Sequence, residues 1–165
     1  MQELTKKILL LGRLGVGKTS MVNRFVHDRF SDTYYSTIGV RIEKKSIAVS
    51  QMQLNLVIWD IAGESSQKNT PQSYFLGAHG IIYLLDVTAP SSYENLTEEI
   101  DFVKQRLPGV PYLVVANKTD LLQPNELAAA IQKIPVSPDL NCSAKNNINV
   151  DNVFMELGRL ILLNP

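Results

Sequence analysis

The sequence is poor in the residues that form disulfides and cysteine or histidine metal sites. Its 165 residues include one cysteine, Cys142, and two widely separated histidines, His27 and His79. A single cysteine excludes a disulfide within the chain and a multi-cysteine metal site, and it fits a reducing compartment. Neither histidine has a histidine or cysteine partner at ligand spacing, so we expect both on the surface. Cys142 has apolar surroundings in sequence and is expected to be a packed thiol rather than a nucleophile.

The sequence also lacks an excess of charge of one sign and any long apolar run. Its 16 Lys and Arg residues are balanced by 16 Asp and Glu residues, so the net charge favours neither nucleic acid nor an anionic membrane surface as a partner. No apolar segment approaches the ~20 residues of a membrane span. Pairs of like charge, such as Lys44-Lys45 and Glu98-Glu99, are expected to be solvated faces. We therefore expect a cytoplasmic protein that does not bind nucleic acid.

The order of the apolar segments predicts one α/β domain over residues 1–165. The length suits a single core, and alternating strands and helices are typical of a mostly parallel sheet with helices on both faces. Strands are expected at 8–11, 40–49, 54–59, 81–85, 112–116 and 140–142, with a hairpin at Gln51-Met52. Apolar residues at helical spacing predict helices around 21–26, 96–107 and 150–160. The expected fold is a single three-layer domain with about six strands.

The segment 12–19 has the spacing G-x-x-x-x-G-K-[ST] of a phosphate-binding loop. It follows an apolar run and precedes a predicted helix, which is the context that this motif requires. Lys18 can reach the outer phosphates and the Thr19 hydroxyl can bind Mg²⁺. The alternative is an ordinary glycine-rich turn. The spacing favours a P-loop NTPase, and its predicted phosphate-binding residues are Gly15, Val16, Gly17, Lys18, Thr19 and Ser20.

Three further polar segments follow predicted strands, at 60–63, 117–120 and 143–145. Ligands of such sheets bind beyond the carboxyl ends of the strands, so these segments would lie near the phosphate loop. Asp60 can hold Mg²⁺ through water, and Gly63 can offer its N–H to a terminal phosphate. Taken one at a time, each segment is better explained as a capped turn.

Together and in this order, the motifs resemble those of the Ras-like small GTPases, most closely the Rab branch. The segment Asn117-Lys118-Thr119-Asp120 matches N-K-x-D, whose aspartate accepts two hydrogen bonds that guanine can donate and adenine cannot. Ser143-Ala144-Lys145 matches the second guanine element, in which the N–H of Ala144 would meet the guanine carbonyl. Phe30 matches the aromatic residue that packs on the base. The resemblance implies a molecular switch that binds GTP or GDP.

The resemblance also implies a magnesium site and a hydrolytic site. Thr37 matches the switch threonine that ligates Mg²⁺ and senses the terminal phosphate, so the implied metal-binding residues are Thr19, Thr37 and Asp60. The implied catalytic residues, around the terminal phosphate, are Lys18, Thr37, Gly63 and Glu64. The implied reaction is hydrolysis of GTP to GDP and phosphate.

Some stretches are specifically Rab-like, including 32–40 and 73–78. Rab relatives present an aromatic trio to their effectors, and the matching residues here are Ile42, Trp59 and Tyr74, so one aromatic is replaced. The resemblance implies that protein effectors and regulators bind a monomer through the loops around Thr37 and Gly63. The alternative for the three side chains is packing within the core.

Two residues depart from the family pattern. Glu64 stands where the family places the glutamine that positions the attacking water, and Leu14 stands where a small or polar residue is usual. An ionised glutamate only accepts hydrogen bonds, so we expect slow hydrolysis. The sequence ends at Pro165 without a hypervariable tail or a terminal cysteine for prenylation, so we expect no membrane anchor in this chain. The alternatives are a GTP-bound scaffold that does not cycle and the G domain of a larger protein.

Overall fold

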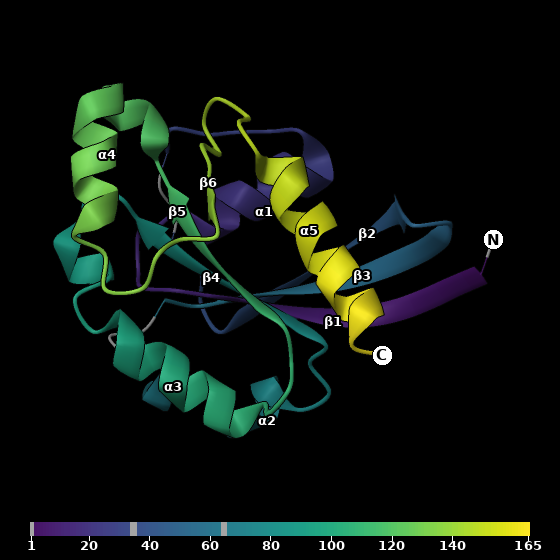
Figure 1. Cartoon of the computed structure of the whole chain (residues 1–165). Helices are drawn as coiled ribbons and strands as arrows, with labels where there is room; N and C mark the ends of the chain where they lie inside the picture. The colour runs from purple at the N-terminus through teal and green to yellow at the C-terminus, as the bar shows by residue number, and fades with distance from the viewer. Residues whose placement is uncertain (1, 34–35, 64–65) are drawn as a thin grey trace.

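The computed structural model describes residues 2–33, 36–63 and 66–165, which form one six-stranded sheet flanked by helices (Figure 1). The strands are β1 (Gln2–Leu11), β2 (Val40–Val49), β3 (Met52–Ile61), β4 (Gly80–Asp86), β5 (Tyr112–Asn117) and β6 (Leu140–Asn141). Their order across the sheet is β2-β3-β1-β4-β5-β6; β2 runs antiparallel to β3, and the other neighbours are parallel. The predicted mostly parallel α/β fold is confirmed.

Helices cover both faces of the sheet, as the buried strands require. They are α1 (Lys18–His27), α2 (Gln72–Phe75), α3 (Leu96–Arg106), α4 (Pro124–Gln132) and α5 (Val150–Leu163). Short 3₁₀ helices lie at η1 (Gln67–Asn69), η2 (Pro90–Ser92) and η3 (Thr119–Leu121). One core contains buried side chains of α1 and α5, and the other those of α2 and α3, with α4 packed against it. Figure 1 shows α1 and α5 on one side of the sheet, and α2 and α3 on the other.

The central strand β1 contributes to both cores. Its Ile8 and Leu10 belong to the core under α1 and α5, whereas Leu9 and Leu11 belong to the opposite core. Successive side chains of a strand point to opposite faces, so a strand covered on both sides has a continuous apolar run. The first core also holds Cys142, which is wholly buried, and burial raises the pKa of its thiol to about 12.

Some local predictions were wrong. The hairpin turns at Ser50 and Gln51, one residue earlier than expected, with φ of +47° and +67°. Both central residues of a type I′ turn take such angles, which glycine or asparagine adopt more readily. Asp60 lies within β3, paired with Leu10 and Arg41, rather than after the strand. Glu99, expected on a solvated face, is buried.

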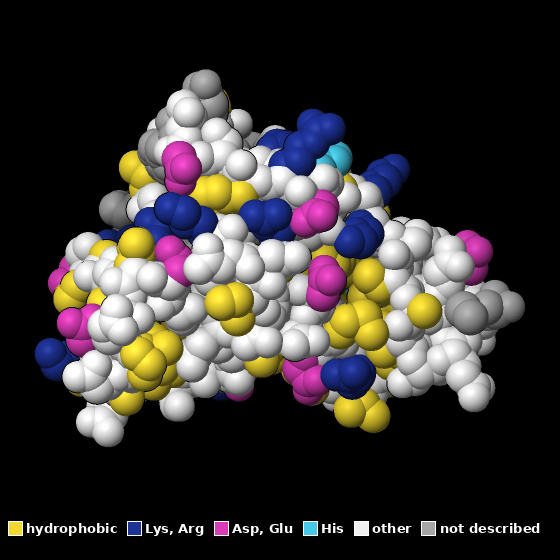
Figure 2. All heavy atoms as spheres, turned by 90° about the horizontal axis from the view of Figure 1, so that it is seen from above, with side chains coloured by type: hydrophobic (Ala, Val, Ile, Leu, Met, Phe, Trp, Pro, Cys, Tyr) yellow, Lys and Arg dark blue, Asp and Glu magenta, His cyan; other side chains and the backbone are white. Residues whose placement is uncertain are grey.

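The surface agrees with the balanced composition. Figure 2 shows one face of the molecule, on which Lys or Arg and Asp or Glu side chains lie interspersed. His79 is exposed, and Nε2 of His27, also exposed, lies 3.3 Å from the Glu43 carboxylate. Within the described residues, no helix is both long enough and apolar enough to cross a membrane.

Candidate functional site

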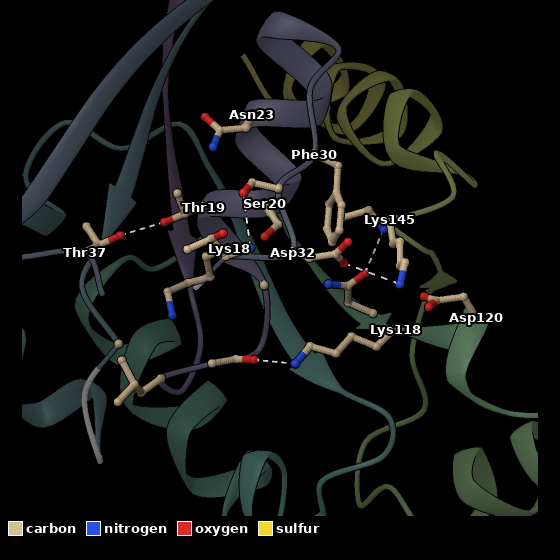
Figure 3. Close-up of a pocket in the computed structure, with 18 of the residues that line it drawn as sticks. Lys18, Thr19, Ser20, Asn23, Phe30, Asp32, Thr37, Lys118, Asp120 and Lys145 are labelled. Atoms are coloured by element: carbon tan, nitrogen blue, oxygen red, sulfur yellow. Dashed lines mark hydrogen bonds and ion pairs between the residues drawn. The ribbon is translucent and has the colours of Figure 1, made fainter. Parts of the chain in front are cut away.

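A cleft of about 320 Å³ lies where β1, β3 and β5 lead into loops (Figure 3). Its walls come from the segment 14–20 with the start of α1, from 30–33, from Thr37 and Gly63, and from 117–121 and 144–145. Most of the predicted site residues therefore meet in one place. Val16, Asp60 and Ser143 do not line the cleft, and all three are buried. Glu64 lies outside the described residues.

The phosphate loop is held against the opposite wall of the cleft. Gly17 precedes α1 with φ of +102°, and a Cβ atom there would lie 2.4 Å from Nδ2 of Asn117. The same Nδ2 donates a hydrogen bond to the carbonyl oxygen of Val16 over 3.0 Å. Only glycine allows so close an approach, because any larger residue would displace the asparagine amide. The loop geometry therefore depends on a residue 100 positions further along the chain.

Lys18 carries a positive charge into the centre of the loop. Its ammonium group donates to the carbonyl oxygens of Gly12 and Arg13, over 2.8 and 2.9 Å. Burial lowers the pKa of Lys18 to about 8, an effect partly offset by the nearby charge of Asp60. A desolvated cation facing a ring of backbone N–H groups at the start of a helix favours an anion.

Three oxygen-bearing side chains meet at one end of the cleft. The Thr19 hydroxyl donates to Oδ2 of Asp60 over 2.6 Å, and it lies 2.6 Å from the Thr37 hydroxyl, which then donates to Thr19. Oδ1 of Asp60 is buried and makes no hydrogen bond to any of the described residues. Burial raises the pKa of Asp60, against the opposing hydrogen bond from Thr19 and the charge of Lys18.

An orphaned carboxylate oxygen beside two hydroxyl groups suits a hard cation. Magnesium takes oxygen ligands and keeps several waters, so Thr19 and Thr37 as ligands and Asp60 through water would fit it. A site for a softer metal is not evident, since the described residues contain no group of three or more His, Cys, Asp or Glu able to hold an ion. The donor set therefore fits the predicted magnesium.

Phe30 and the segment that follows β5 form the other end of the cleft. Figure 3 shows Phe30, Lys118 and Asp120 at this end, away from Lys18, Thr19 and Thr37. Lys118 has φ of +67°, and its ammonium group donates to the carbonyl oxygen of Gly15 over 2.6 Å. It also pairs with the Asp86 carboxylate at 2.9 Å. The aliphatic part of Lys118 is thus stretched across the cleft floor.

Hydrogen bonds orient the polar groups at this end. Oδ1 of Asp120 accepts a hydrogen bond from the Ser143 hydroxyl over 2.7 Å. The Ala144 N–H, predicted to meet a guanine carbonyl, donates instead to Oδ1 of Asn117 over 3.1 Å. A base carbonyl would therefore have to share this N–H with Asn117. Lys145 lies at the rim, where its ammonium group is 3.5 Å from the Asp32 carboxylate.

Sequence reasoning missed two residues that support the cleft. Asp86 holds Lys118, and it could have been found because it ends a buried strand at the same edge as Asn117. Arg24 donates to the carbonyl oxygens of Ala144 and Lys145, over 3.0 and 2.8 Å. No local pattern indicates this contact between positions so far apart. The cleft is also lined by Asn23, Ser31, Asp32, Thr33 and Leu121, none of which was predicted.

The three residues predicted to bind partners lie side by side. Ile42 on β2 pairs with Trp59 on β3, and the rings of Trp59 and Tyr74 make an edge contact with centroids 5.8 Å apart. The ammonium group of Lys7 lies 3.7 Å from the centre of the Trp59 ring. Ile42 is 47% exposed, and the two aromatic residues are partly buried. We call these three residues the Ile42–Trp59–Tyr74 patch.

Comparison with known proteins agrees with this geometry. The model of the Ras family matches residues 7–163. Ras-related protein Rab-13 of Rattus norvegicus is 35% identical over 162 residues, which cover 95% of this chain and 80% of that protein. Rab-13 of Canis lupus familiaris is 36% identical over 166 residues, with the same coverage. GTP-binding protein ypt1 of Schizosaccharomyces pombe is 35% identical over 162 residues, covering 94% of this chain and 79% of ypt1.

The motif resemblance, the sheet order and these matches agree with one another. The matches extend over nearly the whole chain, so they include both ends of the cleft. The chain belongs to the Ras family, in its Rab branch, and is a small GTPase that hydrolyses GTP.

Proposed function

We propose that this GTPase is a magnesium-dependent switch with slow intrinsic hydrolysis, built from residues 1–165 as one domain and acting as a monomer. The observation that carries the proposal is the cleft itself, in which the hydroxyl groups of Thr19 and Thr37 lie at one end and Asp120 at the other, with the phosphate loop between them. GTP has the same order of groups, with its base and its terminal phosphate at opposite ends.

In this proposal the phosphate loop 12–19 and Lys18 bind the phosphates. Backbone N–H groups of residues 15–20 at the start of α1 would face the phosphates. The Lys18 ammonium group would exchange the carbonyl oxygens of Gly12 and Arg13 for phosphate oxygens, which bear more negative charge. Thr19 and Thr37, with Asp60 through water, would hold Mg²⁺, which would supply positive charge to offset negative charge on the transferred phosphoryl group.

In this proposal Asp120 recognises the base. Its carboxylate is oriented by Ser143 and can accept hydrogen bonds from the ring N–H and exocyclic amine of guanine. Adenine offers no such pair of donors and would leave the carboxylate unpaired, which typically causes strong rejection. Phe30 and the aliphatic part of Lys118 would pack on the faces of the ring. This assignment accounts for the Lys118–Asp86 ion pair, which fixes the lysine side chain.

Slow hydrolysis follows from the chemistry of Glu64 and the position of Leu14. A carboxylate cannot donate a hydrogen bond toward the phosphoryl oxygens, as a glutamine amide can. Its charge would also repel the phosphoryl group by up to about 4 kcal/mol at ~4 Å, and a third of that costs roughly tenfold in rate. The Leu14 side chain is 60% exposed at the cleft, where it can obstruct an arginine supplied by a partner.

A second candidate function is a scaffold that stays bound to GTP. It is favoured by the same two residues, because a sufficiently slow enzyme would present its GTP-dependent surface continuously. In either case we infer that effectors and regulators bind the loops around Thr37 and Gly63 and the adjacent Ile42–Trp59–Tyr74 patch. The partly exposed aromatic rings are typical of residues that anchor protein interfaces.

Single-turnover hydrolysis of preloaded GTP tests the proposal. The parent would be compared with Glu64→Gln and Leu14→Gly, and with Glu98→Gln as a control on an exposed glutamate of α3. We expect Glu64→Gln to hydrolyse GTP faster than the parent and the control to be unchanged. A slower Glu64→Gln would show that Glu64 itself assists catalysis and would refute the slow-switch proposal. A parent without measurable turnover would favour the scaffold.

A further inference from the structure

A buried carboxylate joins α3 to the segment that follows Gly63. Glu99 on α3 is 6% exposed, and its Oε2 accepts a hydrogen bond from the backbone N–H of Gln67 over 2.6 Å. Gln67 begins η1 and is 2% exposed. A carboxylate removed from water is unfavourable unless it is hydrogen-bonded, so this contact strongly favours one position of Gln67 relative to α3.

A second set of contacts extends this link to the phosphate loop. Tyr83 on β4 is 2% exposed, and the side chains of Gln67 and Arg13 lie close enough to its hydroxyl to oppose part of the rise in its pKa. Arg13 is the second residue of the loop 12–19. Burial, and next the charge of Glu99, raise the pKa of Tyr83 to about 12, so it remains a neutral hydroxyl. We call Arg13, Gln67, Tyr83 and Glu99 the polar bridge.

The polar bridge lies where apolar packing would otherwise be expected. The neighbouring buried residues of α3 are Leu96, Ile100 and Val103, all members of an apolar core. Apolar residues at such positions usually stabilise at least as well as a buried ionised group. Buried polar networks whose members are satisfied instead specify one arrangement of the elements that they join. The bridge is therefore better explained by positioning than by stability.

The position of Gln67 limits where Gly63 can lie. The two positions are separated by three residues, and an extended chain spans at most ~3.3–3.6 Å per residue. At its other end, Gly63 touches the backbone of Leu14 in the phosphate loop. Gly63 therefore lies against the phosphate loop, and Gln67, four positions later in the sequence, is anchored by Glu99.

We propose that Glu99 is a positioning residue for GTP hydrolysis, which places the Gly63 loop against the terminal phosphate through the N–H of Gln67. Arg13 and Tyr83 tie the same anchor to the phosphate loop. The inference rests on the proposed function, in which Gly63 faces that phosphate. Binding of GDP, which lacks the terminal phosphate, does not require the anchor.

The test compares Glu99→Ala, Glu99→Gln and Tyr83→Phe with Glu98→Ala, a change at the exposed neighbouring glutamate of α3. The measurements are single-turnover hydrolysis of preloaded GTP, the GDP dissociation rate, the ratio of GTP to GDP affinity, and thermal stability. We expect Glu99→Ala to slow hydrolysis on the order of tenfold or more, since misplacement by about 1 Å can cost ~100-fold. GDP dissociation should be unchanged, and Glu99→Gln, which keeps an acceptor for the Gln67 N–H, should restore most of the rate.

Three outcomes would overturn the inference. In the first, the hydrolysis rate of Glu99→Ala equals that of Glu98→Ala. In the second, the rate of Glu99→Ala falls together with its GDP affinity and thermal stability, and Glu99→Gln does not recover the rate, which indicates a structural role only. If Glu99→Ala does not fold, Tyr83→Phe replaces it in the test: we expect that variant to hydrolyse GTP more slowly than the parent, and an unchanged rate with an unchanged affinity ratio refutes the inference. Gly63→Ala separates the two proposals: if that variant hydrolyses GTP normally, the proposed role of Gly63 fails; if it is slow while Glu99→Ala is normal, only the anchor fails.

Discussion

Gly63 lies so close to the phosphate loop that an added methyl group has no room. A Cβ atom at Gly63 would lie 2.5 Å from both N and Cα of Leu14, and 2.9 Å from the carbonyl carbon of Arg13. Ordinary contact begins at 3.4 Å, so Gly63→Ala must widen the gap by the difference between 3.4 and 2.5 Å, about 0.9 Å. All three atoms are backbone, and no side-chain rotation can relieve the clash.

The displacement should slow GTP hydrolysis and leave the rate of GDP dissociation unchanged. A misplacement of about 1 Å in a group that contacts the reacting phosphate costs on the order of 100-fold in rate. We therefore expect Gly63→Ala to slow single-turnover GTP hydrolysis by about that factor, whereas the rate of GDP dissociation stays near that of the parent. Stopped-flow release of a fluorescent GDP analogue would measure the second quantity.

The matched control is Gly109→Ala. Gly109 has φ of +77° and no described atom within 4 Å of an added Cβ, so this change introduces backbone strain without a clash. It should lower thermal stability slightly and leave hydrolysis unchanged. Normal hydrolysis and normal GTP affinity in Gly63→Ala would refute the reasoning, because the close contact with Leu14 would then be irrelevant to the reacting state.

Asp120→Asn should shift preference from guanine toward xanthine nucleotides; equal competition by ATP and GTP for the parent would contradict the assigned base site. Thr19→Asn should weaken magnesium-dependent GTP binding more than GDP binding, and an unchanged affinity ratio would show that the metal is held otherwise. Trp59→Ala should reduce binding to a GTP-selective partner in pull-down titrations without changing nucleotide affinity; lost thermal stability alone would indicate core packing. Cys142 should resist iodoacetamide at pH 8, because burial raises its thiol pKa to about 12 and little thiolate forms below that pH. Rapid labelling of the folded protein would contradict its burial.

Sequence periodicity predicted the sheet well because its central strands β1, β4 and β5 are buried on both faces. The runs in β1, β4 and β5 are apolar without interruption, and those in β1 and β5 each lead into a loop that carries a motif. The position of Asp60 was harder to predict, since a buried carboxylate inside a strand has the same pattern as a carboxylate just after one. Its pairing with Leu10 and Arg41 is a property of three strands together.

The supports of the cleft could not be predicted from local patterns. Glu99 has an acidic neighbour in sequence and was therefore predicted to lie on a solvated face, although it is buried against Gln67. Nothing in the local sequence distinguishes Arg24 from other helix residues, yet it donates hydrogen bonds to two carbonyl groups 120 and 121 residues away. In both cases the partner is a backbone group, and any residue type supplies a backbone group. The sequence around the partner therefore does not predict the contact.

The central place of β1 has a consequence for synthesis of the protein. Ile8 of this strand, among the first residues to leave the ribosome, pairs with Ile58 on one side and with Gly80 on the other. Pairings between such distant positions form slowly, and until Gly80 has emerged the apolar run of β1 has an open edge. Nascent chains shorter than this should need a chaperone or the ribosome surface to cover that edge, and fragments cut between β3 and β4 should aggregate.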